Sequence, residues 1–143
     1  MPIDLEFRHD GAGFIAQCHG ALTITDFVDV QNSLLASPDM LRKLRYGIMD
    51  LTSVETLNLN YEKMVSIVEG DKRLAVVTPP GTLVAIVSPK DLGYGLGRMW
   101  EALVDQFGWE TMTFRFSVEA EHWIQQRAKE KFGIVLAEGL FHP

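Results

Sequence analysis

The sequence predicts an α/β domain with a five-stranded mixed, mainly parallel sheet and four helices. Strand-like and helix-like stretches alternate in the order ββαβαβαβα, which is typical of parallel strands joined by right-handed crossovers. In addition, Leu83–Val87 is an unbroken apolar run, as expected for a strand that is covered on both faces. We therefore expect this strand inside the sheet and not at its edge.

The first two strands are predicted to form a hairpin. Residues 3–7 alternate between apolar and charged side chains, which is the pattern of a half-buried strand. The Asp10-Gly11 pair favours a turn. Residues 14–18 fit a second strand, which we expect to end at Gly20.

The later elements are predicted from periodicity and from end signals. Apolar residues at helical spacing, bounded by capping residues, indicate the four helices. Asn60 is the best N-cap candidate of the second helix. The helices are expected from Thr23 or Thr25 to Ser37, from Asn60, from Leu92 to Gly108 and from Ser117 to Gly133, and the remaining strands at residues 46–51, 83–87 and 111–116.

Length and composition indicate one soluble, cytoplasmic domain. The 143-residue chain carries a net charge of −6, which disfavours nucleic acid and anionic membrane surfaces as partners. No apolar run approaches the roughly 20 residues that cross a bilayer, and the N-terminus has no signal-peptide pattern. One cysteine, Cys18, fits a reducing compartment. We expect a single domain over residues 1–133 and a tail over residues 134–143.

The carboxyl ends of the third and fourth strands predict a ligand site. A crossover helix joins neighbouring parallel strands, so the residues after these two strands should lie close together. Backbone N–H groups at the next helix start, with Lys90 and Arg98, favour a small anionic or polar ligand. The predicted ligand-binding residues are Asp50, Thr52, Ser53, Ser88, Lys90, Tyr94, Gly95 and Arg98.

The same residues also have structural interpretations, which we weigh more heavily. Gly93, Gly95 and Gly97 match neither the dinucleotide fingerprint nor a P-loop. They can instead let a helix approach the sheet, while Arg98 forms a salt bridge. Asp50 can bond to N–H groups of its own loop.

The sequence contains no catalytic constellation and no metal or cofactor pattern. Cys18 and His19 are adjacent, but neighbours on a strand point to opposite faces and cannot act as nucleophile and base. The four histidines have no metal-ligand spacing with the cysteine. Aromatic residues gather in the last third, where they can form core or line an apolar pocket for a small hydrophobe: Trp100, Phe107, Trp109, Phe114, Phe116 and Trp123.

Three stretches match a known pattern when they are taken with the element order. They are Gly20-Ala21-Leu22-Thr23, Met49-Asp50-Leu51-Thr52-Ser53-Val54, and the C-terminal half from Val87-Ser88 through Tyr94-Gly95-Leu96-Gly97-Arg98-Met99 to Phe116-Ser117-Val118-Glu119-Ala120-Glu121-His122-Trp123-Ile124. Together they resemble the STAS-like (SpoIIAA-like) family, which is related to bacterial anti-sigma-factor antagonists. The resemblance spans residues 3–127 and implies the fold of that family.

The sequence departs from the antagonists at one position. In that branch, the loop after the third strand carries a phosphorylatable serine. The resemblance places the matching stretch at Asn58-Leu59-Asn60-Tyr61 and the acceptor position on Asn60. Asparagine cannot accept a phosphoryl group in that chemistry, so we expect no phospho-switch.

We therefore expect a non-enzymatic STAS-like module that binds a small anionic or apolar molecule or a protein partner. Two alternatives remain open. One is a small enzyme that acts on an anionic substrate at the carboxyl edge of the sheet. The other is a homo-oligomeric interaction domain that uses Leu140 and Phe141, and these apolar residues also predict a homodimer.

Overall fold

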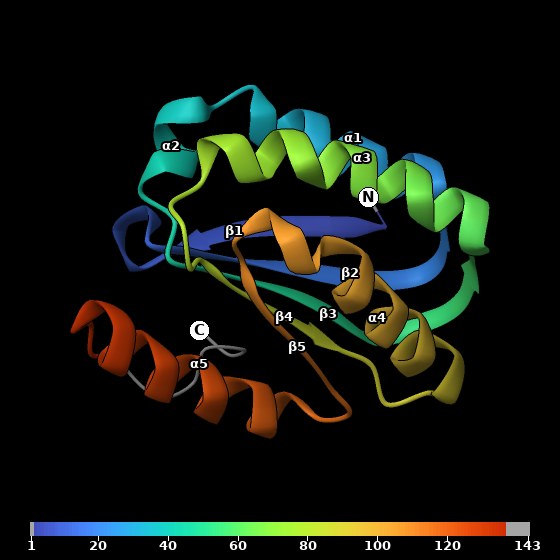
Figure 1. Ribbon diagram of the computed structural model, residues 1–143. Helices are drawn as coiled ribbons and strands as arrows, with labels where there is room; N and C mark the ends of the chain where they lie inside the picture. Colours follow the sequence, from blue (N-terminus) through green and yellow to red (C-terminus); the bar gives the residue numbers. More distant parts are fainter. Residues whose placement is uncertain (1, 137–143) are drawn as a thin grey trace.

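Five strands form one sheet in the computed structural model, which describes residues 2–136. The strands lie side by side in chain order (Figure 1). The first pair is antiparallel and the other pairs are parallel. The strands are β1 (Ile3–Arg8), β2 (Gly13–Thr23), β3 (Tyr46–Asn58), β4 (Leu83–Val87) and β5 (Glu110–Phe114). The predicted mixed sheet is confirmed, and β4 lies inside it, between β3 and β5.

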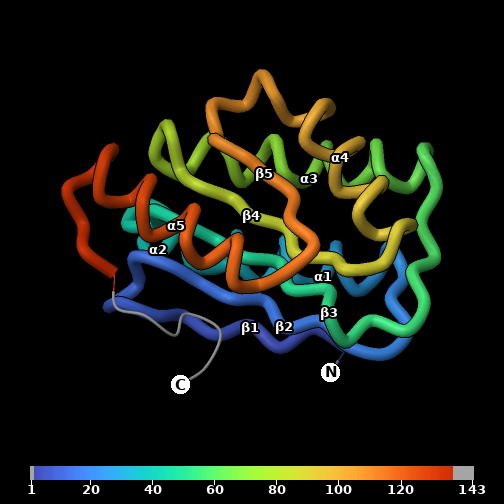
Figure 2. Tube along the Cα trace, turned by 90° about the horizontal axis from the view of Figure 1, so that it is seen from below, coloured from blue at the N-terminus to red at the C-terminus, as the bar shows by residue number. Residues whose placement is uncertain are grey.

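Helices cover both faces of this sheet. Most of them lie over one face, and α5 packs on the other (Figure 1); Figure 2 shows the layers from the α5 side. Residues 2–136 contain α1 (Ile24–Leu35), α2 (Pro38–Arg42), α3 (Tyr61–Val77), α4 (Asp91–Val104) and α5 (Ser117–Phe132), with short 3-10 turns η1 (His9–Gly11) and η2 (Asp105–Phe107). None of these helices has the length and apolarity that a bilayer-spanning segment needs.

The side chains of β4 explain its unbroken apolar run. Leu83, Ala85 and Val87 belong to the apolar cluster under α5. Ile86 is buried in the second cluster, between the sheet and the other helices, and Val84 packs against it. Because successive side chains point to opposite faces and both faces are covered, every position of this strand is apolar.

The limits of β2 and β3 differ from the prediction. β2 continues through Gly20 to Thr23, and Gly20 itself has a positive φ of 72°. Register shifts in the β2–β3 ladder flank this glycine, as in a β-bulge that bends a strand without ending it. The extended β2 provides a parallel partner for residues 53–58, so β3 does not end at residue 51 but reaches Asn58.

The helix prediction was wrong in number and at one cap. The described residues hold five α-helices and not four, because Pro38 opens α2. A proline is tolerated at a helix start, since its missing N–H would have no partner there. Phe116, and not Ser117, occupies the N-cap of α5.

Other local signals are confirmed. Asn60 is the N-cap of α3, and its Oδ1 accepts a hydrogen bond from the Lys63 N–H at 2.9 Å. At the start of α1, the Thr23 N–H donates to Asp26 Oδ2 at 2.9 Å, as in a capping box. In the predicted tail, Leu136 is buried under α5. Leu140, Phe141 and His142 lie outside the described residues.

Candidate functional site

Asp50 has the structural role that the sequence favoured. It is buried, and its Oδ1 accepts hydrogen bonds from the Thr52 N–H at 3.0 Å and the Thr52 hydroxyl at 2.6 Å. It lies within β3, in register with Val87 at the end of β4. Ser53 is exposed. Part of the hydrogen-bonding capacity of Asp50 is therefore already satisfied by its own strand.

Lys90 lies close to β3, as predicted for the carboxyl edge. Its Nζ donates to the Val54 carbonyl at 2.8 Å. The Ser88 hydroxyl donates weakly to the Lys90 carbonyl at 3.5 Å. A Cβ on Gly93 would lie 2.1 Å from Ser88 Oγ, so this glycine lets α4 approach the end of β4.

The rest of the predicted site lies along α4, where its charges have protein partners. Arg98 is 62% exposed and pairs with Glu101 at 3.6 Å. The Tyr94 ring contacts the Arg115 guanidinium, 4.3 Å from the ring centroid. Gly95 has open space around it. An anion site at this edge remains a prediction, and the contacts described fit the structural interpretation of these residues.

The side chains of Cys18 and His19 lie on opposite sides of β2, as expected for neighbouring residues of a strand. Cys18 is buried, and burial, with a further effect from the Asp50 charge, raises the pKa of its thiol to about 12. His19 Nε2 lies 3.1 Å from Asp4 Oδ2 on the other side of the strand. Among residues 2–136, no group of three or more His, Cys, Asp or Glu side chains could hold a metal ion.

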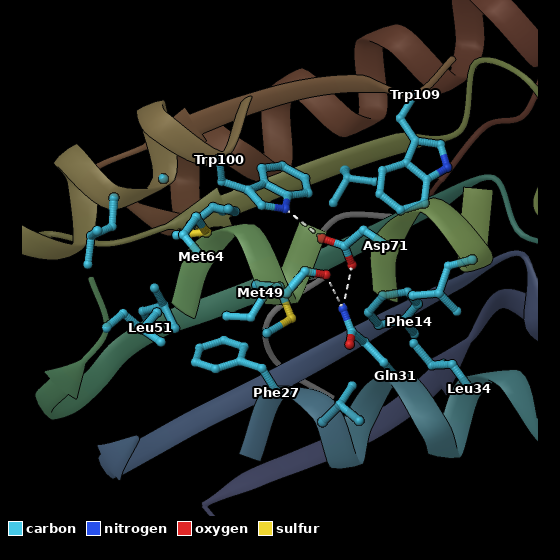
Figure 3. Close-up of a pocket in the computed structure, with 18 of the residues that line it drawn as sticks. Phe14, Phe27, Gln31, Leu34, Met49, Leu51, Met64, Asp71, Trp100 and Trp109 are labelled. Carbon is cyan, nitrogen blue, oxygen red and sulfur yellow. Dashed lines mark hydrogen bonds between the residues drawn. The ribbon is translucent and has the colours of Figure 1, made fainter. Parts of the chain in front are cut away.

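The structure contains a pocket between the sheet and helices α1, α3 and α4 (Figure 3). It has a volume of about 120 Å³ and is partly open to solvent. Apolar side chains form most of its lining, including Phe14, Phe27, Leu34, Met49, Leu51, Met64, Trp100 and Trp109. Two of the aromatic residues expected in core or pocket thus line the pocket, whereas Trp123 of α5 and Phe114 of β5 pack against the apolar cluster on the other face of the sheet.

One carboxylate lines this apolar pocket. Asp71 of α3 is only 8% exposed. Its Oδ2 accepts a hydrogen bond from the Trp100 indole at 2.8 Å, and its Oδ1 accepts one from the Gln31 amide at 3.0 Å (Figure 3). Burial raises the pKa of Asp71 to about 6, although both hydrogen bonds oppose the rise. The Gln31 amide also donates to the Ile67 carbonyl at 2.7 Å.

A glycine allows this network to form between helices. A Cβ on Gly70 of α3 would lie 2.1 Å from Gln31 Oε1. The missing side chain therefore gives the Gln31 amide of α1 room against α3. Through Gln31 and Trp100, Asp71 joins α1, α3 and α4 around the pocket.

The sequence carried a signal for this network. Gln31 is spaced four residues after Phe27 and three before Leu34, on the apolar face of α1. Asp71 has the same spacing on α3, four residues after Ile67 and three before Leu74. Two polar residues at apolar-face positions of two helices indicate a buried polar contact.

Comparisons with known proteins identify the fold. No family model and no curated protein matches the sequence. Among solved structures, an uncharacterised DUF3478-family protein with a SpoIIAA-like fold from Shewanella loihica PV-4 is 19% identical, with a TM-score of 0.51 over 85% of this chain and 91% of that chain. The anti-sigma factor antagonist SpoIIAA in its unphosphorylated form is 15% identical, with a TM-score of 0.51 over 85% of this chain and 96% of that chain. The chain therefore has a SpoIIAA-like, or STAS-like, fold, as the resemblance implied.

Proposed function

We propose that this protein is a non-enzymatic STAS-like module that binds a small, mainly apolar molecule between the sheet and helices α1, α3 and α4. The apolar lining of the pocket carries the proposal, because ligand sites are typically concave, apolar and equipped with few polar groups. An apolar cavity of ~150 Å³ holds a benzene molecule. The pocket of about 120 Å³ therefore suits a ligand with a single ring or a short chain.

The proposal includes a regulatory role with a protein partner, in the cytoplasm and as a homodimer. The likeness to an anti-sigma factor antagonist supports the protein partner. The apolar tail residues Leu140 and Phe141 support the homodimer, and the lone Cys18 supports a reducing compartment. Asn60, at the N-cap of α3, supports a module without a phospho-switch.

Toluene is a suitable first probe of the pocket, because it is one apolar ring. We expect it to shift the NMR signals of the Trp100 and Trp109 indole N–H groups saturably, since both side chains line the pocket. Trp123 provides an internal control, because it belongs to α5 and packs on the opposite face of the sheet. Its indole signal should not move.

A filled pocket should lose this binding. Val30 of α1 lines the pocket, and Val30→Trp would occupy part of its volume. Val118→Trp on α5 is the matched control, because Val118 is 57% exposed. We expect calorimetry to detect toluene binding to the Val118→Trp protein and not to the Val30→Trp protein. Equal toluene affinity in both folded variants, or no saturable binding to the wild type, would contradict the proposed function.

A further inference from the structure

The Asp71 carboxylate faces the pocket, and residues 2–136 provide it with no positively charged partner. Within the described residues, the pocket lining includes no Lys, Arg or His, and Asp71 is its one ionisable residue. The two hydrogen bonds to Asp71 come from an indole and an amide, which are both neutral. Buried charges are normally paired, so this carboxylate gives the apolar pocket an uncompensated negative charge whenever it is ionised.

The carboxylate can accept further hydrogen bonds. Each of its oxygens has more than one acceptor site. The structure provides one donor to Oδ1, from Gln31, and one to Oδ2, from Trp100. A ligand in the pocket can therefore donate to Asp71 without displacing either protein group.

The aromatic lining favours the same kind of ligand. The Trp100 and Trp109 rings have centroids 6.3 Å apart, and both line the pocket together with Asp71 (Figure 3). Indole rings attract cations through their negative faces. In addition, folding has already removed Asp71 from water, so a cationic ligand adds only the desolvation of its own charged group.

From this arrangement we infer that the pocket selects a small apolar amine, whose ammonium group pairs with Asp71 and whose hydrocarbon part fills the apolar space. This inference rests on the proposed function, because it names the ligand class of the same pocket. A ligand of similar shape with a carboxylate group is repelled by the negative charge of Asp71 and is disfavoured. An alcohol retains a hydrogen bond to Asp71 but forms no ion pair.

A matched series of one-ring compounds tests the inference. Benzylamine, benzyl alcohol, toluene and benzoate differ mainly in the polar group, and their affinities can be compared by calorimetry at pH 7.5. We expect benzylamine to bind roughly ten- to a hundredfold more tightly than toluene, the advantage of one charge-assisted hydrogen bond. The alcohol should fall between them, and benzoate should bind most weakly.

Asp71→Asn assigns the preference to this carboxylate. The change keeps the shape and an oxygen acceptor for Trp100, but it removes the charge and replaces the acceptor of the Gln31 amide with an NH2 group. The variant should bind benzylamine no more tightly than toluene. Asp29→Asn, an exposed change on α1, removes the same charge outside the pocket and should leave the preference for the amine intact.

The outcomes separate this inference from the proposed function. If toluene binds to the wild type but benzylamine binds no more tightly, the amine inference is wrong and the apolar pocket stands. An amine preference that survives Asp71→Asn would also overturn the inference, since the preference would then arise elsewhere. If neither toluene nor benzylamine binds saturably, both proposals fail.

Discussion

Ionisation of Asp71 should lower the free energy of unfolding of this protein as the pH rises. Burial raises the pKa of this carboxyl from 3.8 to about 6 in the folded state. A raised carboxyl pKa means that folding favours the protonated form. The stability associated with Asp71 is therefore fully present below pH 3.8 and is lost as the pH rises through about 6.

The size of this loss of stability follows from the change in the Asp71 pKa on folding. One pKa unit corresponds to about 1.4 kcal/mol, so the change from 3.8 to about 6 corresponds to about 3 kcal/mol of unfolding free energy. Asp71→Asn cannot ionise and escapes this loss. The unfolding free energy of the variant, relative to that of the wild type, should therefore increase by about 2–3 kcal/mol between pH 4 and pH 7.5.

Urea unfolding of both proteins, followed by circular dichroism at several pH values, measures this gain. The difference between the two free energies is the informative quantity, because titrations of groups common to both proteins largely cancel in it. Asp29→Asn controls for the loss of one negative charge. A difference between Asp71→Asn and wild type that stays constant from pH 4 to pH 7.5 would refute the reasoning.

Three further outcomes are expected. Gly97→Ala should lower the unfolding free energy by about 1–3 kcal/mol, because its Cβ would lie 2.7 Å from Thr113 Cγ2, whereas Gly95→Ala on the same helix meets nothing within 4 Å and should stabilise the protein by about 0.5–1 kcal/mol. Urea unfolding would measure both changes, and equal destabilisation by the two substitutions would contradict the packing argument. Intact mass after incubation with anti-sigma-type kinases should show no added phosphoryl group, and one that maps to residues 58–66 would overturn the Asn60 prediction. Light scattering at micromolar concentration should report a homodimer, and a 16.1 kDa species would count against it.

The order of the elements could be predicted because its signals are local. The apolar run of β4 reports burial on both faces, whatever its neighbours are. The ends of β2 and β3 could not be predicted in the same way. Residues 52–58 are largely polar and exposed, since they extend beyond β4 and pair along one side only, with the end of β2. Their strand conformation depends on a partner distant in the chain, which no local pattern specifies.

The predicted ligand site shows a related limit. The sequence placed Lys90 and Asp50 at neighbouring strand ends, and the structure does bring Lys90 to β3. The sequence could not specify which hydrogen-bond partners these groups have in the folded protein. Lys90 reaches a carbonyl of β3, and Arg98 pairs with a residue one turn further along α4. Long cationic side chains find such partners after folding, so their charge alone is weak support for a binding site.

The contrast between the edge and the pocket explains why we propose the pocket, and not the edge, as the ligand site. At the edge, an incoming anion must compete with the carbonyl that Lys90 contacts and the carboxylate that Arg98 contacts, and it gains little in exposed surroundings. In the pocket, Asp71 is held by neutral donors on two other helices, so an incoming cation displaces no competing positive charge. Its attraction also acts in surroundings of low polarity, where it is stronger than in water. A buried carboxylate that has only neutral partners among residues 2–136 therefore leaves a ligand more free energy to gain than the exposed basic residues of the sheet edge.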